Sequence, residues 1–555
     1  MDGLLRLAGA FTASATWWVF LLASAVGCVV LVLRLASFVR RLATGDADAR
    51  RRAFVSCALF AIAFAVRWLL PERTHYTFND EYEYVAYART LLATHVYGLP
   101  SGPPAGVFLW ALAFVPLGVS THAVFTTTIV LGSLTPPALA WMLRVLRVER
   151  AVALTAAVLL ALAPLHVKHS ASASLEVLSL LCVVLAVGTF VELLRTPGLL
   201  RSVCFAVSLF FALTMRVENW ALLALLPLVW WLWRDEARLR SPVSALFVPP
   251  ALAVAVAAVY VPGILAAPIR WEPAWKSRLP AAKLLLTNLA FFVGGDPWTG
   301  KVPLVLGAVG LVAGLRTRAR AVALWLAFLL LYSVIYVFYG LNVGWLEEPH
   351  QPPPWGARGA GHDMFRFNVV LLAPVVLLLA YGLVALARGA WAALRVDVDG
   401  RRRPLRVAAL AGGVVLVAVL LAWRGEYATY RPLELIASRY NRGYEIAELR
   451  FLLDATASVA AGARLYLPPP AQGIVLGEIE TRPLAALHVD LARGNTGGEA
   501  LLYVSGRHLG VSGVRTRIAT LQRRFELHEI ARRREGPDTF QLFALRPRKR
   551  AAAAQ

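Results

Sequence analysis

The feature that most constrains this chain is a succession of long apolar runs, separated by short loops that are rich in arginine. Most of the runs approach the ~20 residues that a helix needs to cross the hydrocarbon core of a bilayer. Of the 555 residues, 59% are hydrophobic and only 16% are charged. This combination excludes a wholly soluble protein and predicts an all-α polytopic membrane protein.

About twelve transmembrane helices are predicted from the apolar runs. They cover residues 15–38, 53–70, 122–143, 151–167, 173–194, 202–217, 219–233, 243–264, 302–315, 321–341, 367–387 and 407–423. Alternate loops carry the arginines, so the positive-inside rule places those loops in the cytoplasm and the N-terminus outside. The same rule accounts for the net charge of +23, and we therefore predict no nucleic-acid partner.

The predicted loop at residues 71–121 lies on the outer face and contains a short apolar segment at 106–120. Pro103 and Pro104 precede this segment and Pro116 lies within it. It is too short to cross a bilayer, so we expect an interfacial or re-entrant helix.

The chemistry of the chain changes at about residue 424, where the apolar runs end. Residues 440–461 have the spacing of an amphipathic helix, and short strand-like runs follow at 464–467, 501–504, 525–528 and 540–545. We predict three regions. They are an extra N-terminal helix with its cytoplasmic loop (1–52), a transmembrane catalytic module (53–423), and a small extracytoplasmic α/β domain with a basic tail (424–555).

An acidic stretch lies in the first outer loop, where three carboxylates and two tyrosines fall within residues 80–84. Asp80 and Glu81 are the candidate catalytic residues, because a carboxylate at the membrane surface can deprotonate an attacking hydroxyl. Asp80 could also cap a helix, with Glu83 as the reciprocal partner. Tyr84 could stack on a sugar or lie among the interfacial aromatic residues.

Cationic side chains recur at the predicted outer ends of the spans, where a lipid phosphate would lie. They are Lys168, His169, Arg216, His362 and Arg366. Such groups can stabilise a departing polyprenyl phosphate. Two alternatives remain open: Arg216 could pair with Glu218, and His169 could be an ordinary interfacial residue.

Several segments resemble the GT-C glycosyltransferases over residues 53–387. They are Asn79 to Arg89, Gly102-Pro103-Pro104, Ala163 to Ala171, Ser174-Leu175-Glu176, Leu213 to Arg216, and Arg366-Phe367. The similarity is to the branch that holds dolichyl-phosphate-mannose-protein mannosyltransferases and aminoarabinose transferases (glycosyltransferase family 39-like). That family commonly has a lysine around position 216, where this chain has arginine. The first span is extra, and the C-terminal region matches no domain of the family.

The resemblance implies inverting transfer of a sugar from a polyprenyl-phosphate-linked donor to an envelope acceptor, which would be a lipid, glycan or protein hydroxyl. Asp80 would be the general base, and Arg216 and Arg366 would face the lipid phosphate. Glu176 would lie near the acceptor or the donor sugar. We add Tyr84, His169, Glu218 and His362 to the expected substrate-binding residues. The expected setting is the bacterial inner membrane.

No Walker, Rossmann or HExxH motif is present, and no third ligand lies at metal spacing beside His166 and His169. We therefore expect no protein-built metal site and no cofactor, and the sequence leaves a divalent cation open. Two other functions compete with glycosyl transfer. One is a lipid or polysaccharide transporter or flippase, and the other is an assembly protein that binds through its C-terminal domain.

Overall fold

The computed structural model describes residues 2–69, 79–97, 103–238, 245–261, 301–317, 319–338 and 368–395, and parts of 451–547. The chain divides into two compact units. Unit 1 comprises residues 1–72, 99–106 and 128–431, and unit 2 comprises residues 73–98, 107–127 and 432–555.

Unit 1 is built from apolar helices. Five helices in the described residues are long and apolar enough to cross a membrane: Ala13–Ala43, Ala47–Leu69, Ala123–Val145, Leu175–Arg195 and Val369–Gly389. They belong to α1 (Asp2–Ala43), α2 (Ala47–Leu69), α5 (Thr121–Val145), α8 (Leu175–Arg195) and α18 (Asn368–Arg395). These findings support a multi-pass membrane protein, while the number of twelve spans remains a prediction.

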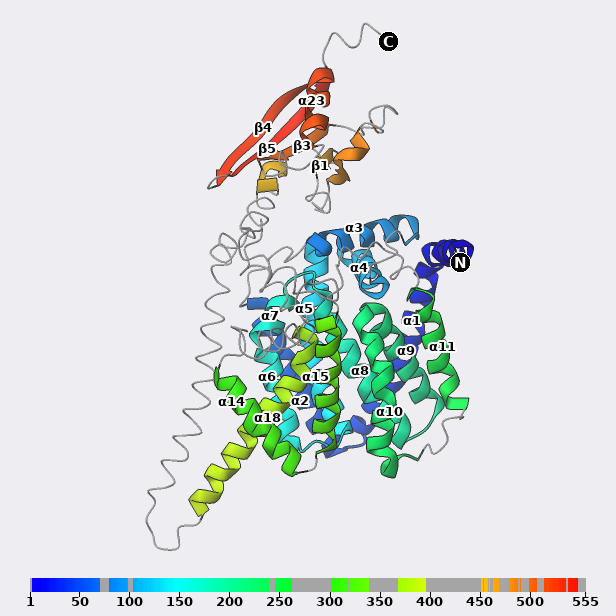
Figure 1. Ribbon diagram of the computed structural model, residues 1–555, viewed down its shortest axis with the longest axis vertical. Coiled ribbons are helices and arrows are strands. Elements are labelled where there is room, and N and C mark those ends of the chain that lie inside the picture. The colour runs from blue at the N-terminus through cyan, green and yellow to red at the C-terminus, as the bar shows by residue number, and fades with distance from the viewer. Residues whose placement is uncertain are drawn as a thin grey trace. The chain divides into compact units, whose positions relative to one another are not determined.

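The described residues of unit 1 also form shorter helices (Figure 1). They are α6 (Arg150–Leu162), α7 (Pro164–Ser170), α9 (Leu199–Met215), α10 (Ala221–Trp233), α11 (Val248–Ala258), α14 (Lys301–Arg316) and α15 (Arg320–Phe338). Three 3₁₀ turns lie beside them: η1 (Val217–Trp220), η2 (Arg234–Glu236) and η3 (Ala245–Phe247). The predicted span at 407–423 lies outside the described residues.

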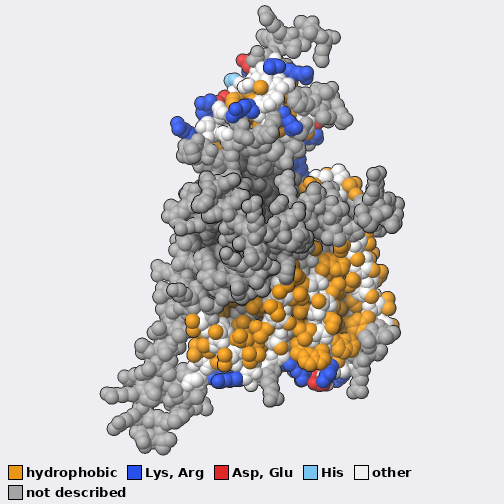
Figure 2. All heavy atoms as spheres, in the orientation of Figure 1, with side chains coloured by type: hydrophobic (Ala, Val, Ile, Leu, Met, Phe, Trp, Pro, Cys, Tyr) orange, Lys and Arg blue, Asp and Glu red, His pale blue; other side chains and the backbone are white. Residues whose placement is uncertain are grey.

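Hydrophobic side chains are exposed over the outer surface of unit 1. Leu22, Leu31 and Val32 of α1 are 66%, 65% and 62% exposed. Figure 2 shows hydrophobic side chains covering the helical part of the visible face, with charged side chains gathered at its lower edge. An apolar band bordered by charge is the surface expected of helices that contact lipid.

The predicted span at 151–167 is interrupted in the structure. Helix α6 ends at Leu162, Ala163 is extended with φ −61° and ψ 116°, and α7 begins at Pro164. Proline lacks an amide N–H and disfavours helical backbone in the residue before it. Pro164 therefore divides the run into two helices, and the second carries the two histidines of this segment.

Helices α14 and α18 pack with their backbones in close contact. A Cβ atom on Gly310 would lie 1.8 Å from the carbonyl oxygen of Leu378, and one on Gly382 would lie 2.3 Å from that of Leu306. Only glycine fits at these two positions. Small residues that allow close approach are a common means of association for helices in membranes.

Unit 2 begins with two helices from the first predicted outer loop. Helix α3 (Asn79–Thr94) carries the acidic stretch, and the short apolar helix α4 (Pro104–Leu117) follows it. Within unit 2, Arg89 of α3 donates from Nη1 to Thr481 Oγ1 at 3.1 Å. This contact joins α3 to the C-terminal sheet.

The C-terminal part of unit 2 is a five-stranded mixed sheet in the order β2-β1-β3-β5-β4. The strands are β1 (Arg464–Leu467), β2 (Glu480–Pro483), β3 (Ala500–Ser505), β4 (Phe525–Glu535) and β5 (Asp538–Pro547). Strand β1 pairs in parallel with β2 and β3, and β5 pairs antiparallel with β3 and β4.

Helix α23 (Val514–Arg524) completes the C-terminal domain. It buries Val514, Ile518 and Leu521, which share one helical face. They join a core with Tyr466 and Leu502 from the sheet. The domain is therefore of mixed α/β type, as predicted, and β2 and α23 are elements that the sequence analysis did not identify.

Candidate active site

Helices α8 and α9 bring three predicted substrate-binding residues together. Glu176 lies in the first turn of α8, and Arg216 directly follows the last residue of α9. The two helices run in opposite directions, so these residues meet at one end of unit 1. Glu218 follows in the 3₁₀ turn η1, because the chain becomes extended at Arg216, with φ −153° and ψ 143°.

The guanidinium of Arg216 binds both glutamates. Its Nη1 donates to Glu176 Oε1 at 2.5 Å, and its Nε and Nη2 donate to the two oxygens of Glu218 at 3.2 and 2.8 Å. The second oxygen of Glu176 accepts a hydrogen bond from Ser174 Oγ at 2.6 Å. The side chains of Arg216, Glu176 and Glu218 are only 14%, 3% and 6% exposed.

This cluster holds two carboxylates and one guanidinium. With both glutamates ionised it carries one net negative charge in a nearly buried setting, which is costly without further polar partners. Glu218 also lines an apolar cavity of about 550 Å³ formed with Trp220, Ala258 and Ile335. The cluster therefore presents a carboxylate that can accept hydrogen bonds from a hydroxyl-bearing ligand in that cavity.

A buried amide supports the turn beneath the cluster. Asn219 Nδ2 donates to Ser179 Oγ and to the carbonyl of Ala212, both at 2.8 Å, and Asn219 Oδ1 accepts from the Tyr332 hydroxyl at 2.8 Å. These bonds tie η1 to α8, α9 and α15. A fully paired amide fixes the backbone of its turn. The bonds of Asn219 therefore fix the positions of Arg216 and Glu218 in the chain beside it.

A second buried polar group lies at the ends of α2 and α7. Arg67 is fully buried and donates to the carbonyls of Ala63 and Ala161, at 2.9 and 3.0 Å. It also contacts Ser170 Oγ at 3.1 Å and His166 Nδ1 at 2.6 Å. A guanidinium that binds this many acceptors stabilises the packing of the helices that carry them.

The remaining predicted site residues are placed as follows. Asp80 and Glu81 lie in the first turn of α3, which begins at Asn79, and their side chains lie outside the described residues. Tyr84 is half-buried on the same helix. His169 lies on α7 and is 1% exposed. His362 and Arg366 lie outside the described residues.

Among the residues that the structure describes, no group of three or more His, Cys, Asp or Glu side chains is arranged to hold a metal ion. The expectation of no metal and no cofactor stays a prediction.

Sequence reasoning missed the buried partners Arg67, Ser179 and Tyr332. Each is a single polar residue within an apolar run. A charged residue inside a span is a signal in itself, because it is expensive to bury without partners, and Arg67 could have been found in this way. Ser179 and Tyr332 give no such signal, since their partner Asn219 is 40 and 113 residues away.

The comparisons with known proteins concern the fold. No protein-family model matches the sequence, and no curated protein matches it. Similar solved structures include ArnT from Cupriavidus metallidurans in the apo state, with 13% identity and a TM-score of 0.50. The same protein bound to undecaprenyl phosphate gives 14% and 0.51. Both matches cover 88% of this chain and 97% of the ArnT chain.

An oligosaccharyltransferase from Archaeoglobus fulgidus, solved with Zn and sulfate, is similar at 13% identity and a TM-score of 0.40. That match covers 81% of this chain and 67% of the archaeal one. The likeness to ArnT extends over nearly its whole length, including a small domain after the helices. The predicted fold is thereby confirmed: the chain has the fold of ArnT.

Proposed function

We propose that this protein is a membrane glycosyltransferase that moves a sugar from a polyprenyl-phosphate-linked donor to an envelope acceptor on the extracytoplasmic face. The observation that carries the proposal is the fold shared with ArnT, which has been solved with undecaprenyl phosphate bound. A lipid-linked donor requires a helical protein that admits a lipid from the bilayer. The lipid-facing helices of unit 1 suit that requirement.

In the proposed reaction, Asp80 takes the proton of the acceptor hydroxyl as its oxygen attacks the anomeric carbon of the donor sugar. The bond from that carbon to the phosphate oxygen breaks, and the polyprenyl phosphate leaves with the electron pair. A positioned general base contributes about 100- to 10,000-fold to such a step. Glu81, the next residue of the helix, is the second proposed catalytic residue.

The cluster of Glu176, Arg216 and Glu218 is proposed to bind substrate. Its support is burial, charge and a neighbouring cavity at one end of the helices. Because Arg216 already binds two carboxylates, we propose that Glu218 turns toward sugar hydroxyls when a donor enters. The Arg216 guanidinium would then face the phosphate. Tyr84, His169, His362 and Arg366 remain proposed binding residues.

The proposed setting is the bacterial plasma membrane, with the C-terminal domain outside the cytoplasm. The arginines near the C-terminal end of α1 and the N-terminal end of α2 lie at the end of unit 1 opposite to Glu176 and Arg216. Arg34 pairs with Glu192 near the end of α8, whereas Glu176 lies in the first turn of that helix. Under the positive-inside rule, the Arg216 cluster then faces the extracytoplasmic side.

The test is replacement of the proposed base. Membranes that contain the Asp80→Asn variant should transfer sugar at least about 100-fold more slowly than wild type, with unchanged amounts of folded protein. The matched control is Asp235→Asn, since Asp235 is an exposed aspartate of η2 with a side chain 68% exposed. Near-normal transfer by Asp80→Asn would defeat the assignment of the base.

A second variant tests the donor site. Arg216→Ala should raise the donor concentration needed for half-maximal transfer, because a cationic partner of the phosphate is lost. The same variant should leave the dependence on acceptor concentration nearly unchanged. An unaltered donor dependence would remove Arg216 from the proposed phosphate site.

A further inference from the structure

The end of unit 1 opposite to the Arg216 cluster holds two adjoining pockets. One, of about 440 Å³, lies among α2, α5 and α6, and the other, of about 620 Å³, lies among α1, α2, α5, α8 and α9. Arg52, Ser56, Trp141, Arg144 and Glu192 line both pockets. The two therefore form one continuous recess, which we call the arginine pocket.

The arginine pocket has a strong excess of positive charge. Seven arginines line it, against two carboxylates. Both carboxylates are already paired: Glu192 with Arg34, and Asp48 with Arg52. Five arginines of the pocket remain, and no carboxylate of the described residues lies within ion-pairing distance of them. They are Arg41, Arg51, Arg144, Arg150 and Arg201. Unpaired guanidinium groups gathered in one recess repel one another unless an anion lies between them.

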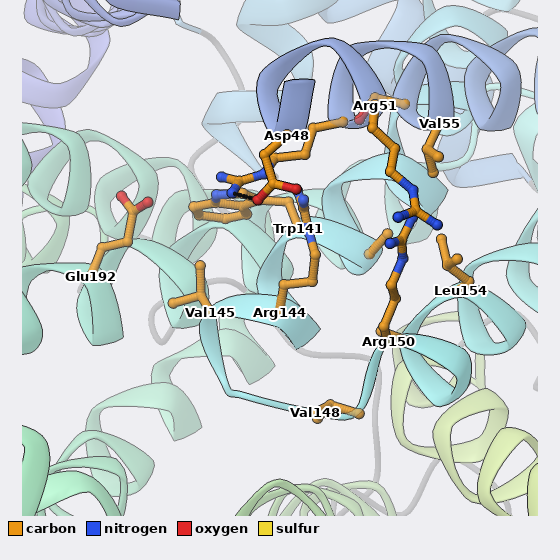
Figure 3. Close-up of a pocket in the computed structure, with 14 residues that line it drawn as sticks. Asp48, Arg51, Val55, Trp141, Arg144, Val145, Val148, Arg150, Leu154 and Glu192 are labelled. Carbon is orange, nitrogen blue, oxygen red and sulfur yellow. Dashed lines mark hydrogen bonds and ion pairs between the residues drawn. The ribbon is translucent and has the colours of Figure 1, made fainter. Parts of the chain in front are cut away.

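Two of these arginines face each other. Figure 3 shows the guanidinium groups of Arg51, from α2, and Arg150, from α6, pointing toward one another across the pocket. Arg150 is also the first residue of α6, and the N-cap residue Glu149 makes no side-chain capping hydrogen bond. The positive end of the α6 dipole therefore lies at Arg150, which lines the pocket. Facing guanidinium groups are suited to a phosphate, which accepts bidentate hydrogen bonds from each.

The walls of the pocket continue into apolar, exposed helix surface. Leu33 of α1 lines the pocket and is 53% exposed, and Phe54 of α2 is 74% exposed. A ligand with a phosphate and hydrocarbon chains would place its headgroup among the arginines and its chains along these helices. A soluble phosphate would leave that apolar surface uncovered.

From these observations we infer that the arginine pocket binds an anionic phospholipid of the bilayer, with the phosphodiester headgroup between Arg51 and Arg150. This site lies at the end of the helices away from the Arg216 cluster. Basic pockets between membrane helices are known to hold acidic lipid headgroups. The inference does not depend on the proposed transfer reaction.

The experiment uses the full-length protein, purified in detergent and stripped of lipid. Phosphatidylglycerol is the probe, and phosphatidylcholine with the same acyl chains is the neutral comparison. Binding is measured as lipid retained by the intact protein in native mass spectrometry, and independently as the rise in unfolding temperature. We expect phosphatidylglycerol, and not phosphatidylcholine, to bind and to stabilise the wild-type protein.

The Arg51→Gln/Arg150→Gln variant should bind phosphatidylglycerol about thirtyfold more weakly, because each arginine near the surface contributes about fivefold to affinity for an acidic lipid. The control is Arg234→Gln/Arg316→Gln, which removes two exposed arginines outside the pocket and should bind like wild type. If the double variant does not purify, Arg51→Gln alone should lose about fivefold.

Two results would overturn the inference. The first is equal affinity of wild type and pocket variants for phosphatidylglycerol, which would mean that the arginines attract lipid only as a general surface charge. The second is stabilisation by inorganic pyrophosphate equal to that by phosphatidylglycerol at the same concentration. That outcome would assign the pocket to a soluble phosphate instead of a lipid.

Discussion

At the residue scale, the cluster around Arg216 depends on one guanidinium that binds two carboxylates. Three of its nitrogens donate hydrogen bonds to carboxylate oxygens of Glu176 and Glu218, and both glutamate side chains are almost entirely buried. Lysine could supply one charge at this place, but it could not hold both carboxylates in a planar fork. The arginine at position 216 is therefore matched to the two glutamates that it binds.

The first prediction concerns that match. Arg216→Gln should lower the free energy of unfolding by about 3–5 kcal/mol, because two buried carboxylates lose their charged partner. Adding Glu218→Gln should restore part of the loss, since one of the uncompensated charges is then removed. The measurement is thermal unfolding in detergent. A double variant that is as unstable as the sum of the two single variants would contradict a coupled cluster.

The second prediction concerns pH and the C-terminal domain. Burial, together with a hydrogen bond to Asp490, raises the pKa of Tyr466 to about 12, from about 10 in an unfolded chain. The folded state therefore keeps a proton that the unfolded state releases, and stability falls as pH rises from 10 to 12. The loss attributable to Tyr466 approaches about 3 kcal/mol at the upper end of that range.

Tyr466→Phe removes this titration, so its unfolding temperature should fall less steeply than that of wild type between pH 10 and pH 12. Below pH 10 the two proteins should keep a constant difference in stability. Parallel pH profiles throughout the alkaline range would contradict the assigned role of the Tyr466 proton.

At the scale of elements, the packing of unit 1 depends on small residues at close helix contacts. Helices α14 and α18 approach until Gly310 meets the carbonyl of Leu378. Along α18, Gly389 has no atom within 4 Å of the position of a Cβ. Glycine is therefore needed for helix packing at position 310 and not at position 389.

The third prediction follows from this difference. Gly310→Ala should lower the unfolding free energy by about 1–3 kcal/mol, because the helices must separate to admit the methyl group. Gly389→Ala, the matched control in α18, should be neutral or stabilise by up to about 1 kcal/mol. Equal effects of the two substitutions on the unfolding temperature would contradict the close contact.

A fourth prediction concerns the helix that carries the proposed base. Arg89 joins α3 to Thr481 of β2, and Arg89→Ala should make α3 open more readily. The amide protons of α3 should exchange about fivefold faster, as expected for the loss of about 1 kcal/mol. Arg523→Ala, an exposed arginine of α23, should not change that rate. Unchanged exchange in Arg89→Ala would show that α3 is held by other contacts.

The elements differ in how well the sequence predicted them. The span predicted at 173–194 is α8, Leu175–Arg195, because a long apolar run between charged residues allows few alternatives. Strand β2 and helix α23 were missed, since the first is four residues long and the second is rich in arginine. Pairing with β1 determines β2, and packing of Val514, Ile518 and Leu521 against the sheet stabilises α23.

At the scale of the whole molecule, the membrane class could be predicted, because hydropathy and loop charge constrain a polytopic protein strongly. The GT-C-like fold was expected only from the resemblance of several short segments to that family. The site was predicted only in part. The pairing of Arg216 with Glu218 was one of the alternatives left open by the sequence, and the structure shows it. The contact of Arg216 with Glu176 was not predicted, because it depends on the antiparallel packing of α8 and α9. Arg67 and Tyr332 were not named, since their partners lie on helices distant in the sequence.

The central claim is that this fold cleaves the bond between a sugar and a polyprenyl phosphate. The most direct test incubates membranes containing the wild-type chain with a panel of radiolabelled polyprenyl-phosphate sugars. The account predicts that, for one donor, label moves into an envelope acceptor while an equal amount of free polyprenyl phosphate is released. Movement of the intact labelled donor across the membrane, with no release of polyprenyl phosphate, would contradict it.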